Sequence, residues 1–259
     1  MNWFPIFLDL RSASCLVVGG GAVAGRKAKQ LLAAGARVTV TAPELHLDLS
    51  RLAERGAIVH IARTFEPGMM DDCELAIAAT DSSEVNRQVS IEARRRRLPV
   101  NVVDEPALCK FIMPAIVDRS PVVIAVSTGG CAPVLARKLK TRIEALLPRD
   151  LGTLATVAGS LRQRVKTRVP DSNARRRLWE YFFDETIAGH VDSRHAAQVR
   201  PMIETLIDSG IESKPQGDVC LIGPAPEDPE LLTLKALRLM QQCDVILHDE
   251  IVSPGVLAL

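Results

Sequence analysis

Three glycines between an apolar run and an alanine-rich stretch form the pattern in this sequence that is best suited to binding phosphate. Gly19, Gly21 and Ala24 fit the spacing G-x-G-x-x-A. In such a pattern the first glycine makes a tight turn, the second lets a pyrophosphate approach the backbone, and the small third residue lets the helix pack closely. Backbone N–H groups at the start of that helix would then hold a dinucleotide. The alternative interpretation is a tight packing turn without a ligand.

The residue that would bind the adenosine ribose is displaced from its usual place. An acidic residue is expected about twenty positions after the glycines, at the end of the second strand. Thr41 stands there instead, and Glu44 follows three residues later. The backbone from Ala42 to Glu44 is therefore expected to meet the ribose. Arg37 could attract a 2′-phosphate, but it lies at the opposite end of the strand, so we favour NAD over NADP.

Asp104 is the strongest candidate for acid–base chemistry. It ends an expected strand, close to Asn101, at the edge of the sheet where the nicotinamide of a bound dinucleotide should lie. A half-buried carboxylate at this place could accept a proton, or offer an oxygen to a metal ion in passing. The competing interpretation is a loop carboxylate that caps the turn at Glu105 and Pro106.

Two turns rich in hydroxyl groups follow other expected strands. The turn that begins at Thr80 could contact a ligand, or one of its serines could close the first turn of the next helix. Ser127 and Thr128, followed by two glycines, could form a small anion-binding nest ahead of a helix, or only cap that helix.

Composition excludes several classes of protein. The chain has 259 residues, with 32 Lys+Arg against 31 Asp+Glu and only 3% aromatic residues, which argues against a nucleic-acid binder. No apolar run reaches the roughly 18 residues of a membrane span, and residues 1–10 lack the features of a signal peptide. The six cysteines contain no C-x-x-C pair, so we expect reduced thiols and a soluble, cytoplasmic protein. His190 and His195 lie near one another without the pattern of a zinc site.

Apolar β-branched runs alternate with helix-patterned stretches through the first hundred residues, which predicts an α/β fold with a parallel sheet. We expect strands at 15–19, 37–41, 57–62, 75–79 and 99–103, and helices at 22–34 and 85–97. Closely spaced strands at 111–114, 115–117 and 122–126, a helix at 133–147 and a helical region at 151–207 should follow. The last expected elements are strands at 218–223 and 245–249 with a helix at 231–242.

An ordered set of motifs resembles the siroheme synthase family over essentially the whole chain. The set includes VGGGAVAGRK from Val18, IAATD from Ile77, NVVD from Asn101, FIMP from Phe111, DRSP from Asp118, AVSTGG from Ala125 and PVLAR from Pro133. In that family a homodimeric module is both a precorrin-2 dehydrogenase and a sirohydrochlorin ferrochelatase, and a second module is a uroporphyrinogen-III C-methyltransferase.

The resemblance implies a division of the chain into parts. These are a Rossmann-type NAD-binding domain at 1–113, a small strand-rich dimerisation segment at 114–148, a helical domain at 149–207, a linker at 208–216 and a methyltransferase-like fragment at 217–259. The resemblance also implies that Ala22, Val23, Pro43 and Glu44 contact NAD, and that Asp104 serves both dehydrogenation and the insertion of Fe²⁺. Thr128 stands where the family commonly has serine.

The implied substrates are tetrapyrroles that carry eight carboxylates. Arginine can hold a carboxylate with two hydrogen bonds, so our own candidates for substrate binding are Arg119 and Arg137, beside Asn101, Ser127 and Thr128. Two other functions stay open: a dehydrogenase without chelation, and a non-catalytic regulatory protein that binds NAD or a tetrapyrrole.

The last segment departs from the family pattern. Pro226 and Asp249 match the proline that contacts S-adenosylmethionine and the proposed proton acceptor of the methyltransferase. However, the family's G-A-G-P-G-D reads GPAPED from Gly223, and Ala225 and Glu227 replace glycines that a bound ligand would need. A fragment of about 40 residues also cannot enclose a core of its own. We therefore expect that this chain does not use S-adenosylmethionine and does not transfer methyl groups.

Overall fold

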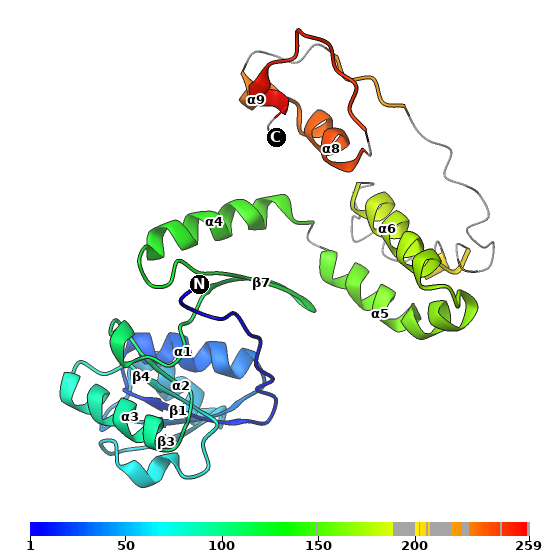
Figure 1. Ribbon diagram of the computed structural model, residues 1–259. Coiled ribbons are helices and arrows are strands. Elements are labelled where there is room, and N and C mark those ends of the chain that lie inside the picture. Colours follow the sequence, from blue (N-terminus) through cyan, green and yellow to red (C-terminus); the bar gives the residue numbers. More distant parts are fainter. Residues whose placement is uncertain are drawn as a thin grey trace. The chain divides into compact units, whose positions relative to one another are not determined.

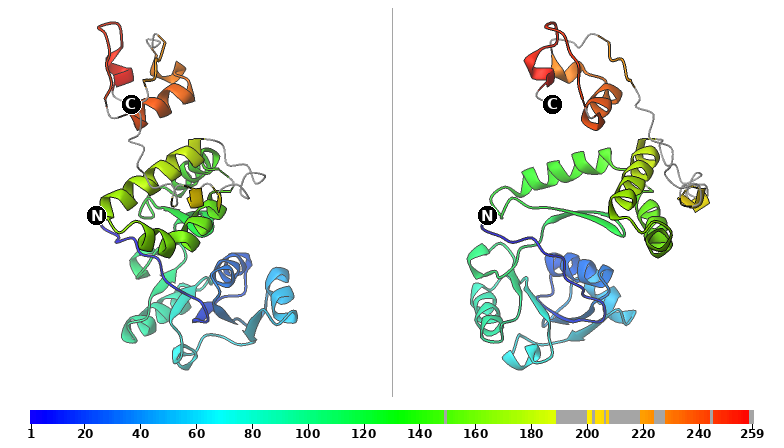
Figure 2. Two further views of the ribbon diagram at one scale, coloured as in Figure 1. Left: turned by 90° about the vertical axis from the view of Figure 1, so that its right-hand side faces the viewer. Right: turned by 45° about the vertical axis from the view of Figure 1, so that its right-hand side comes forward.

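A computed structural model describes most of the chain (Figures 1 and 2). The described residues are 1–148, 150–188, 200–201, 203–205, 207, 219–223, 228–243 and 245–257. The chain divides into two compact units, Met1–Leu161 with Asp184–Arg200, and Arg162–Phe183 with Pro201–Leu259.

A five-stranded parallel sheet forms the centre of the first unit, as the apolar runs predict. Its strands are β1 (Ser14–Val18), β2 (Arg37–Thr41), β3 (Ile58–Ile61), β4 (Leu75–Ala78) and β5 (Val100–Val102). Their order is β3-β2-β1-β4-β5, which is a Rossmann-type arrangement. The chain crosses from one side of β1 to the other between β3 and β4. Ligands of open α/β sheets bind at such a switch point, beyond the carboxyl ends of the strands.

Helices cover both faces of the sheet. The side chains of Cys15 and Val17 pack with α1 (Ala22–Ala33) and α2 (Leu47–Glu54) on one face. Leu16 and Val18 pack with α3 (Ser83–Arg95) on the other. Because alternate residues of a strand point to opposite faces, a strand buried on both sides must be apolar throughout. Helix α2 was not among the expected elements, since its eight residues are too short to show a clear helical period.

A hairpin and a helix follow the sheet. Strands β6 (Ala115–Arg119) and β7 (Val122–Val126) pair antiparallel, and α4 (Pro133–Leu146) packs against them (Figure 1). Two short 3₁₀ helices, η1 (Pro67–Met70) and η2 (Pro106–Leu108), lie before them in the chain. The expectation of a strand at 111–114 was wrong: Phe111 donates its N–H to the carbonyl of Val100 of β5, and the segment then continues to the hairpin without forming a strand.

The rest of the described chain is helical or irregular. The helices are α5 (Leu151–Arg168), α6 (Ser172–Ala188), η4 (Pro229–Leu231), α8 (Leu234–Gln242) and α9 (Pro254–Leu257). The two strands expected near the end were wrong, because residues 219–223 and 245–249 are irregular and largely exposed, as Leu221 at 99% illustrates. Within the described residues, no helix combines the length and the apolar character that a membrane crossing requires.

The buried side chain of Leu16 gives a test of this core. Replacing Leu16, which is fully buried on β1, with alanine removes apolar contacts and leaves a cavity, which costs about 3 kcal/mol of unfolding free energy. The matched Leu47→Ala change, at a side chain 58% exposed at the start of α2, should cost less than about 0.5 kcal/mol. Urea denaturation of the two variants measures both values. Equal losses would contradict the assignment of Leu16 to the core.

Candidate functional site

The turn between β1 and α1 contains two glycines that packing requires. Gly19 has a φ of 126°, and a Cβ atom built on it would lie 2.2 Å from the carbonyl oxygen of Ala79. A Cβ atom on Gly20 would lie 1.9 Å from the carbonyl oxygen of Glu44. Gly19 thus makes the tight turn that the spacing predicts. The requirement at Gly20 was missed, although the run of three glycines was a visible signal.

Gly21 differs from its two neighbours because a Cβ atom on it would meet no described atom within 4 Å. Gly21 is the N-cap of α1, and among the described residues no side chain caps this helix and no acidic residue lies in its first turn. The first N–H groups of a helix have no partner inside it, so those of Ala22 and Val23 are available to a ligand. Ala24 is fully buried, which lets α1 pack closely on the sheet. Open space beside free donors fits a pyrophosphate.

The loop after β2 forms one side of this turn. The hydroxyl of Thr41 is buried and donates to the carbonyl of Arg63 at 2.7 Å, so it is not presented to a ligand. Pro43 and Glu44 are exposed beyond it, and the N–H of His46 donates to the carbonyl of Gly20 at 2.7 Å. The backbone of the Pro43–Glu44 segment therefore lies against the glycine turn, where the ribose of a dinucleotide was expected.

The turn after β4 is held by a buried amide. Asn86, 4% exposed on α3, donates to the carbonyl of Thr80 at 3.0 Å and accepts from the Thr80 hydroxyl at 2.8 Å. Ser82 caps the first turn of α3 by accepting from the N–H of Val85. The N–H of Thr80 also donates to the Asn86 amide oxygen at 3.4 Å, so the hydroxyl and both backbone groups of Thr80 serve the turn. Asn86 was missed because a helical asparagine gives no sign in the sequence of where it points.

Asp104 lies at the same edge of the sheet as the glycine turn. The strand register pairs Val18 with Ala78 and Ala78 with Val102. Two residues further along each chain this register leads to Gly20, Thr80 and Asp104. Neighbouring strands lie about 4.8 Å apart, so the ends of β1 and β5 are roughly 10 Å apart, within the length of a dinucleotide.

Asp104 itself is exposed, which corrects the expectation of a half-buried carboxylate. It occupies the turn after β5 with a φ of 60°, in the left-handed region. The half-buried Lys27 of α1 lies close enough to sense it: burial and the neighbouring Arg26 lower the pKa of Lys27, whereas the charge of Asp104 opposes that change. Helix α1 and the Asp104 turn therefore share one electrostatic environment.

The turn from Ser127 to Gly130 approaches the Asp104 turn. The place where the glycine turn and the Asp104 turn share one edge of the sheet is called the corner of the site. A Cβ atom on Gly130, whose φ is 88°, would lie 3.8 Å from Pro106, two residues beyond Asp104. The Ser127 hydroxyl accepts from the N–H of Gly129, and the Thr128 hydroxyl accepts from the N–H of Ala132 at 3.1 Å. Both hydroxyls thus shape the start of α4.

Arg137 is exposed on the second turn of α4. It is an arginine on the helix that follows the Ser127–Gly130 turn.

Asn101 does not face this corner, in contrast to its expected role in binding substrate. Its side chain is 7% exposed, and its amide nitrogen donates to the carbonyl of Phe111 at 3.0 Å. Asn101 therefore holds the segment that returns along β5.

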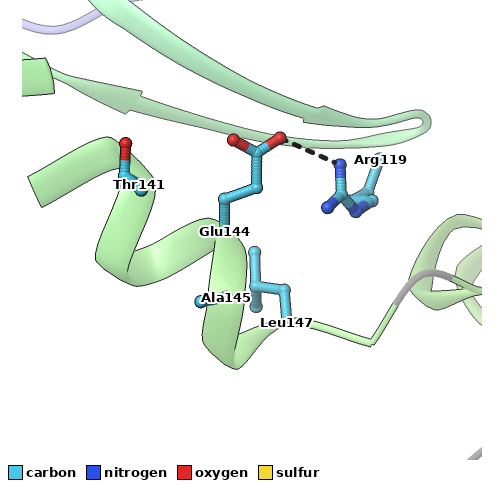
Figure 3. A pocket seen from close by; sticks show the side chains of 5 residues that line it. All are labelled: Arg119, Thr141, Glu144, Ala145 and Leu147. Carbon is cyan, nitrogen blue, oxygen red and sulfur yellow. Dashed lines mark hydrogen bonds and ion pairs between the residues drawn. The ribbon is translucent and has the colours of Figure 1, made fainter. Parts of the chain in front are cut away.

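Arg119 also lies away from the substrate-binding position that the sequence predicts for it. It lies at the tip of the β6–β7 hairpin, while Ser127 follows the opposite end of β7. The strands are five residues long, which separates the two ends by about 14 Å. Figure 3 shows Arg119 turned toward Glu144 of α4. The nitrogen–oxygen distance of this ion pair is 3.4 Å, and both residues line an open hollow of about 580 Å³. The antiparallel pairing thus takes Arg119 away from Asp104.

The remaining candidates fall outside this corner. His190, His195 and Pro226 lie outside the described residues. Asp249 is exposed and accepts from the N–H of Ile251 at 3.1 Å. Within the part of the chain that the structure describes, no group of three or more histidine, cysteine or acidic side chains could hold a metal ion.

Three family descriptions match successive parts of the chain. Residues 6–115 match "Putative NAD(P)-binding", residues 119–146 match "Sirohaem biosynthesis protein central", and residues 150–207 match "Sirohaem synthase dimerisation region". Relatives named siroheme synthase align with the whole chain, at 51% identity in Methylobacillus flagellatus and 48% in Chromobacterium violaceum. The chain is thus similar to siroheme synthases along its whole length. It spans 55% of the length of each of these two relatives.

A solved structure supports the fold of this chain. The chain titled "SirC, precorrin-2 dehydrogenase" is similar over 80% of this chain and over its own full length, with a TM-score of 0.61 and 21% identity. The family description that mentions dimerisation covers α5 and α6, whereas our expected dimerisation segment, 114–148, overlaps mainly the central description. The domain boundaries stay a prediction.

The three glycines that follow β1 give a sharp test. Gly21 has a φ of −81°, so Gly21→Ala should leave the melting temperature unchanged while its methyl group occupies the open space expected for phosphate. We expect NAD⁺ to bind about 10-fold more weakly, measured by calorimetry. Gly19→Ala should instead cost about 2 kcal/mol of stability, because of the positive φ and the contact with Ala79. A stable Gly21→Ala variant with unchanged NAD⁺ affinity would contradict this placement of the phosphates.

Proposed function

We propose that this chain oxidises precorrin-2 to sirohydrochlorin with NAD⁺ and then inserts Fe²⁺ to give siroheme. The observation that carries the proposal is that Asp104 and the free helix donors after Gly21 share one edge of the sheet. Siroheme synthase is the name of the relatives at up to 51% identity, and precorrin-2 dehydrogenase is that of the similar solved structure. The chain spans about half of those relatives, so its activities are inferred for this part alone.

The chain's own contribution to holding NAD⁺ comes from its backbone. The N–H groups of Ala22 and Val23, at an N-terminus that no described side chain caps, would bind the pyrophosphate. The backbone at Pro43 and Glu44 would meet the ribose, and that of Thr80 lies between the glycine turn and Asp104. When bound, NAD⁺ accepts a hydride from the substrate.

Asp104 would act as the general base of the oxidation. Removing two electrons and two hydrogen nuclei from precorrin-2 sends one hydride to NAD⁺ and leaves one proton to be accepted. A carboxylate at the end of β5 lies on the side of the glycine turn where the redox ring of a dinucleotide is expected. Because Asp104 is exposed, a flat macrocycle can reach it from solvent.

Insertion of Fe²⁺ also requires a group that accepts protons. Two pyrrole N–H protons must leave the macrocycle as the metal ion enters, and Asp104 would accept them in turn. Fe²⁺ is a substrate here, not a resident ion. Within the described residues no metal-binding cluster stands elsewhere, so a second candidate function is the oxidation alone, without chelation.

Cations near this corner suit a substrate with many carboxylates. Lys27 of α1 lies near Asp104, and the exposed Arg137 stands on the helix that follows the Ser127–Gly130 turn. The two glycines of that turn, with φ values of 66° and 88°, keep its backbone compact beside Trp3 and Pro106. Arg137 is therefore our candidate for binding substrate carboxylates. Arg119 and Asn101, which are turned to other partners, are not.

Replacing Asp104 tests whether one carboxylate serves both reactions, and siroheme formation by the unaltered chain separates the two candidate functions. Asp104→Asn keeps the shape and removes the base, so the rate of NADH formation from precorrin-2, followed at 340 nm, should fall about 10²- to 10⁴-fold. If the same carboxylate serves chelation, the rate of siroheme formation from sirohydrochlorin and Fe²⁺ should fall as well. Retained chelation would sink the shared-base hypothesis and leave the oxidation in place.

The control is a carboxylate at the opposite edge of the sheet. Asp72 is exposed just before β4 begins, so Asp72→Asn makes the same change in charge away from the site. Both rates should stay within about twofold of the unaltered chain. If the unaltered chain forms no NADH from precorrin-2 while it binds NAD⁺, it is a binding protein and not a dehydrogenase.

We also propose that the chain forms a homodimer through the β6–β7 hairpin and α4. Val117 and Ala136 are buried where α4 covers the hairpin, whereas Ile116 and Val123 are exposed on these two strands. Further apolar side chains of α4 are exposed: Val134, Leu135 and Leu139. A two-stranded sheet with one covered face is marginally stable alone, and groups of exposed apolar side chains suit an interface with a second copy of the chain.

A charge on the open face of the hairpin tests the dimer. Val123→Glu would bury an unpaired carboxylate in the interface, which should weaken dimerisation about 100-fold. Val59→Glu, at a valine 62% exposed on β3, is the matched control and should leave the dimer intact. Light scattering over a dilution series measures both. A Val123→Glu dimer as tight as the control would contradict this interface.

A reducing compartment such as the cytoplasm suits the cysteines. All six have free thiols. Cys15 and Cys109 are buried, and burial raises the pKa of Cys15 to about 11. A thiol that stays protonated is a poor nucleophile, so these buried cysteines serve packing and hydrogen bonding.

A further inference from the structure

The outer side of β5, where no further strand of the described sheet follows, is hydrogen-bonded to the chain segment that returns along it. β5 is the last strand of the described sheet, and in a parallel strand alternate residues direct their backbone groups to opposite sides. The N–H of Val103 donates to Ala78 of β4, so Val100 and Val102 direct theirs outward. Lys110 donates its N–H to the carbonyl of Val100 at 2.7 Å. Edge groups of this kind need partners when they are buried.

The thiol of Cys109 supplies the partners of Val102. Its Sγ atom accepts from the N–H of Val102 at 3.2 Å and lies 3.2 Å from the carbonyl oxygen of the same residue, to which the S–H donates. The amide of Asn101 approaches the sulfur at 3.5 Å. Cys109 is 8% exposed, and burial raises the pKa of its thiol, so the S–H donor persists at neutral pH. One side chain thus satisfies a donor and an acceptor of the strand.

The residues between Val102 and Cys109 form the turn that carries Asp104. Asp104 itself has a φ of 60°, and η2 leads from this turn to Cys109. The Glu105 N–H donates to the Val102 carbonyl at 3.3 Å, and this hydrogen bond closes the tight turn in which Asp104 lies. A left-handed aspartate keeps its conformation only when its surroundings hold it. The contacts of Cys109 fix both ends of this turn.

We propose that Cys109 is a positioning residue that holds the Asp104 turn in place for the reaction, an inference that rests on the proposed function. The thiol does not touch substrate or cofactor. It fixes the backbone from which the carboxylate projects, and a misplacement of about 1 Å at a reacting group can lower a rate up to about 100-fold. The second neighbour of this turn, Gly130 beside Pro106, would be displaced with it.

Two variants of Cys109 and one control test the proposal in the full chain. Cys109→Ala leaves both polar groups of Val102 without the sulfur, whereas Cys109→Ser keeps a donor and an acceptor. Cys73→Ala removes a different, half-buried thiol, which donates to the carbonyl of Met69 instead of to the turn. Hydrogen–deuterium exchange of a peptide covering residues 102–109 should become roughly 5-fold faster in Cys109→Ala. It should stay within about twofold of the unaltered chain in the other two variants.

Kinetics then connect the turn to Asp104. With precorrin-2 and NAD⁺, Cys109→Ala should lower kcat about 10-fold while KM for NAD⁺ stays within about twofold, because the glycine turn is untouched. Cys109→Ser should restore most of kcat. Unchanged exchange in Cys109→Ala, or faster exchange without a fall in kcat, overturns the proposal. If the unaltered chain does not oxidise precorrin-2, the proposed function fails, and the exchange comparison still decides whether Cys109 holds the turn.

Discussion

The close approach of two backbone segments to the turn after β1 is the constraint on which the rest of this site depends. One methyl group on Gly19 or Gly20 would fall within 2.2 Å of a neighbouring carbonyl oxygen. Without those methyl groups, the ends of β1, β2 and β4 can meet at one edge. That meeting directs the uncapped start of α1 toward the same place as the turn after β5. A wider turn would separate the helix donors from Asp104.

Most polar side chains around this edge serve the scaffold. The Thr80 hydroxyl and the Asn86 amide bind one another, the Thr41 hydroxyl binds a carbonyl, and the Asn101 amide holds the segment after η2. The Ser127 and Thr128 hydroxyls cap their own turn in the same way. What the edge offers to a ligand is therefore mainly backbone N–H groups and exposed carboxylates, Asp104 among them. In the proposed mechanism Asp104 alone acts as the base, which suits a surface on which the bound molecules bring their own reactive groups.

The sequence predicts the sheet well because buried parallel strands must be apolar on both faces, as Leu16 and Val17 are. The positions of Gly19 and Asp104 at one edge follow from the same pattern, since parallel strands end together. Side-chain directions are less accessible. Nothing in the order of residues says that Asn101 turns inward, or that antiparallel pairing carries Arg119 to the tip of a hairpin. The need for Gly20 depends on Glu44, 24 positions away, and only the folded chain brings the two together.

In the proposed mechanism, the exposure of Asp104 has a consequence for how this base loses its proton between the two reactions. A carboxylate that is enclosed must pass its proton along a chain of other groups before it can accept another. Asp104 is open to bulk water, so it can lose that proton directly to solvent each time a product departs. A single acid can then serve two successive reactions without a relay built into the protein.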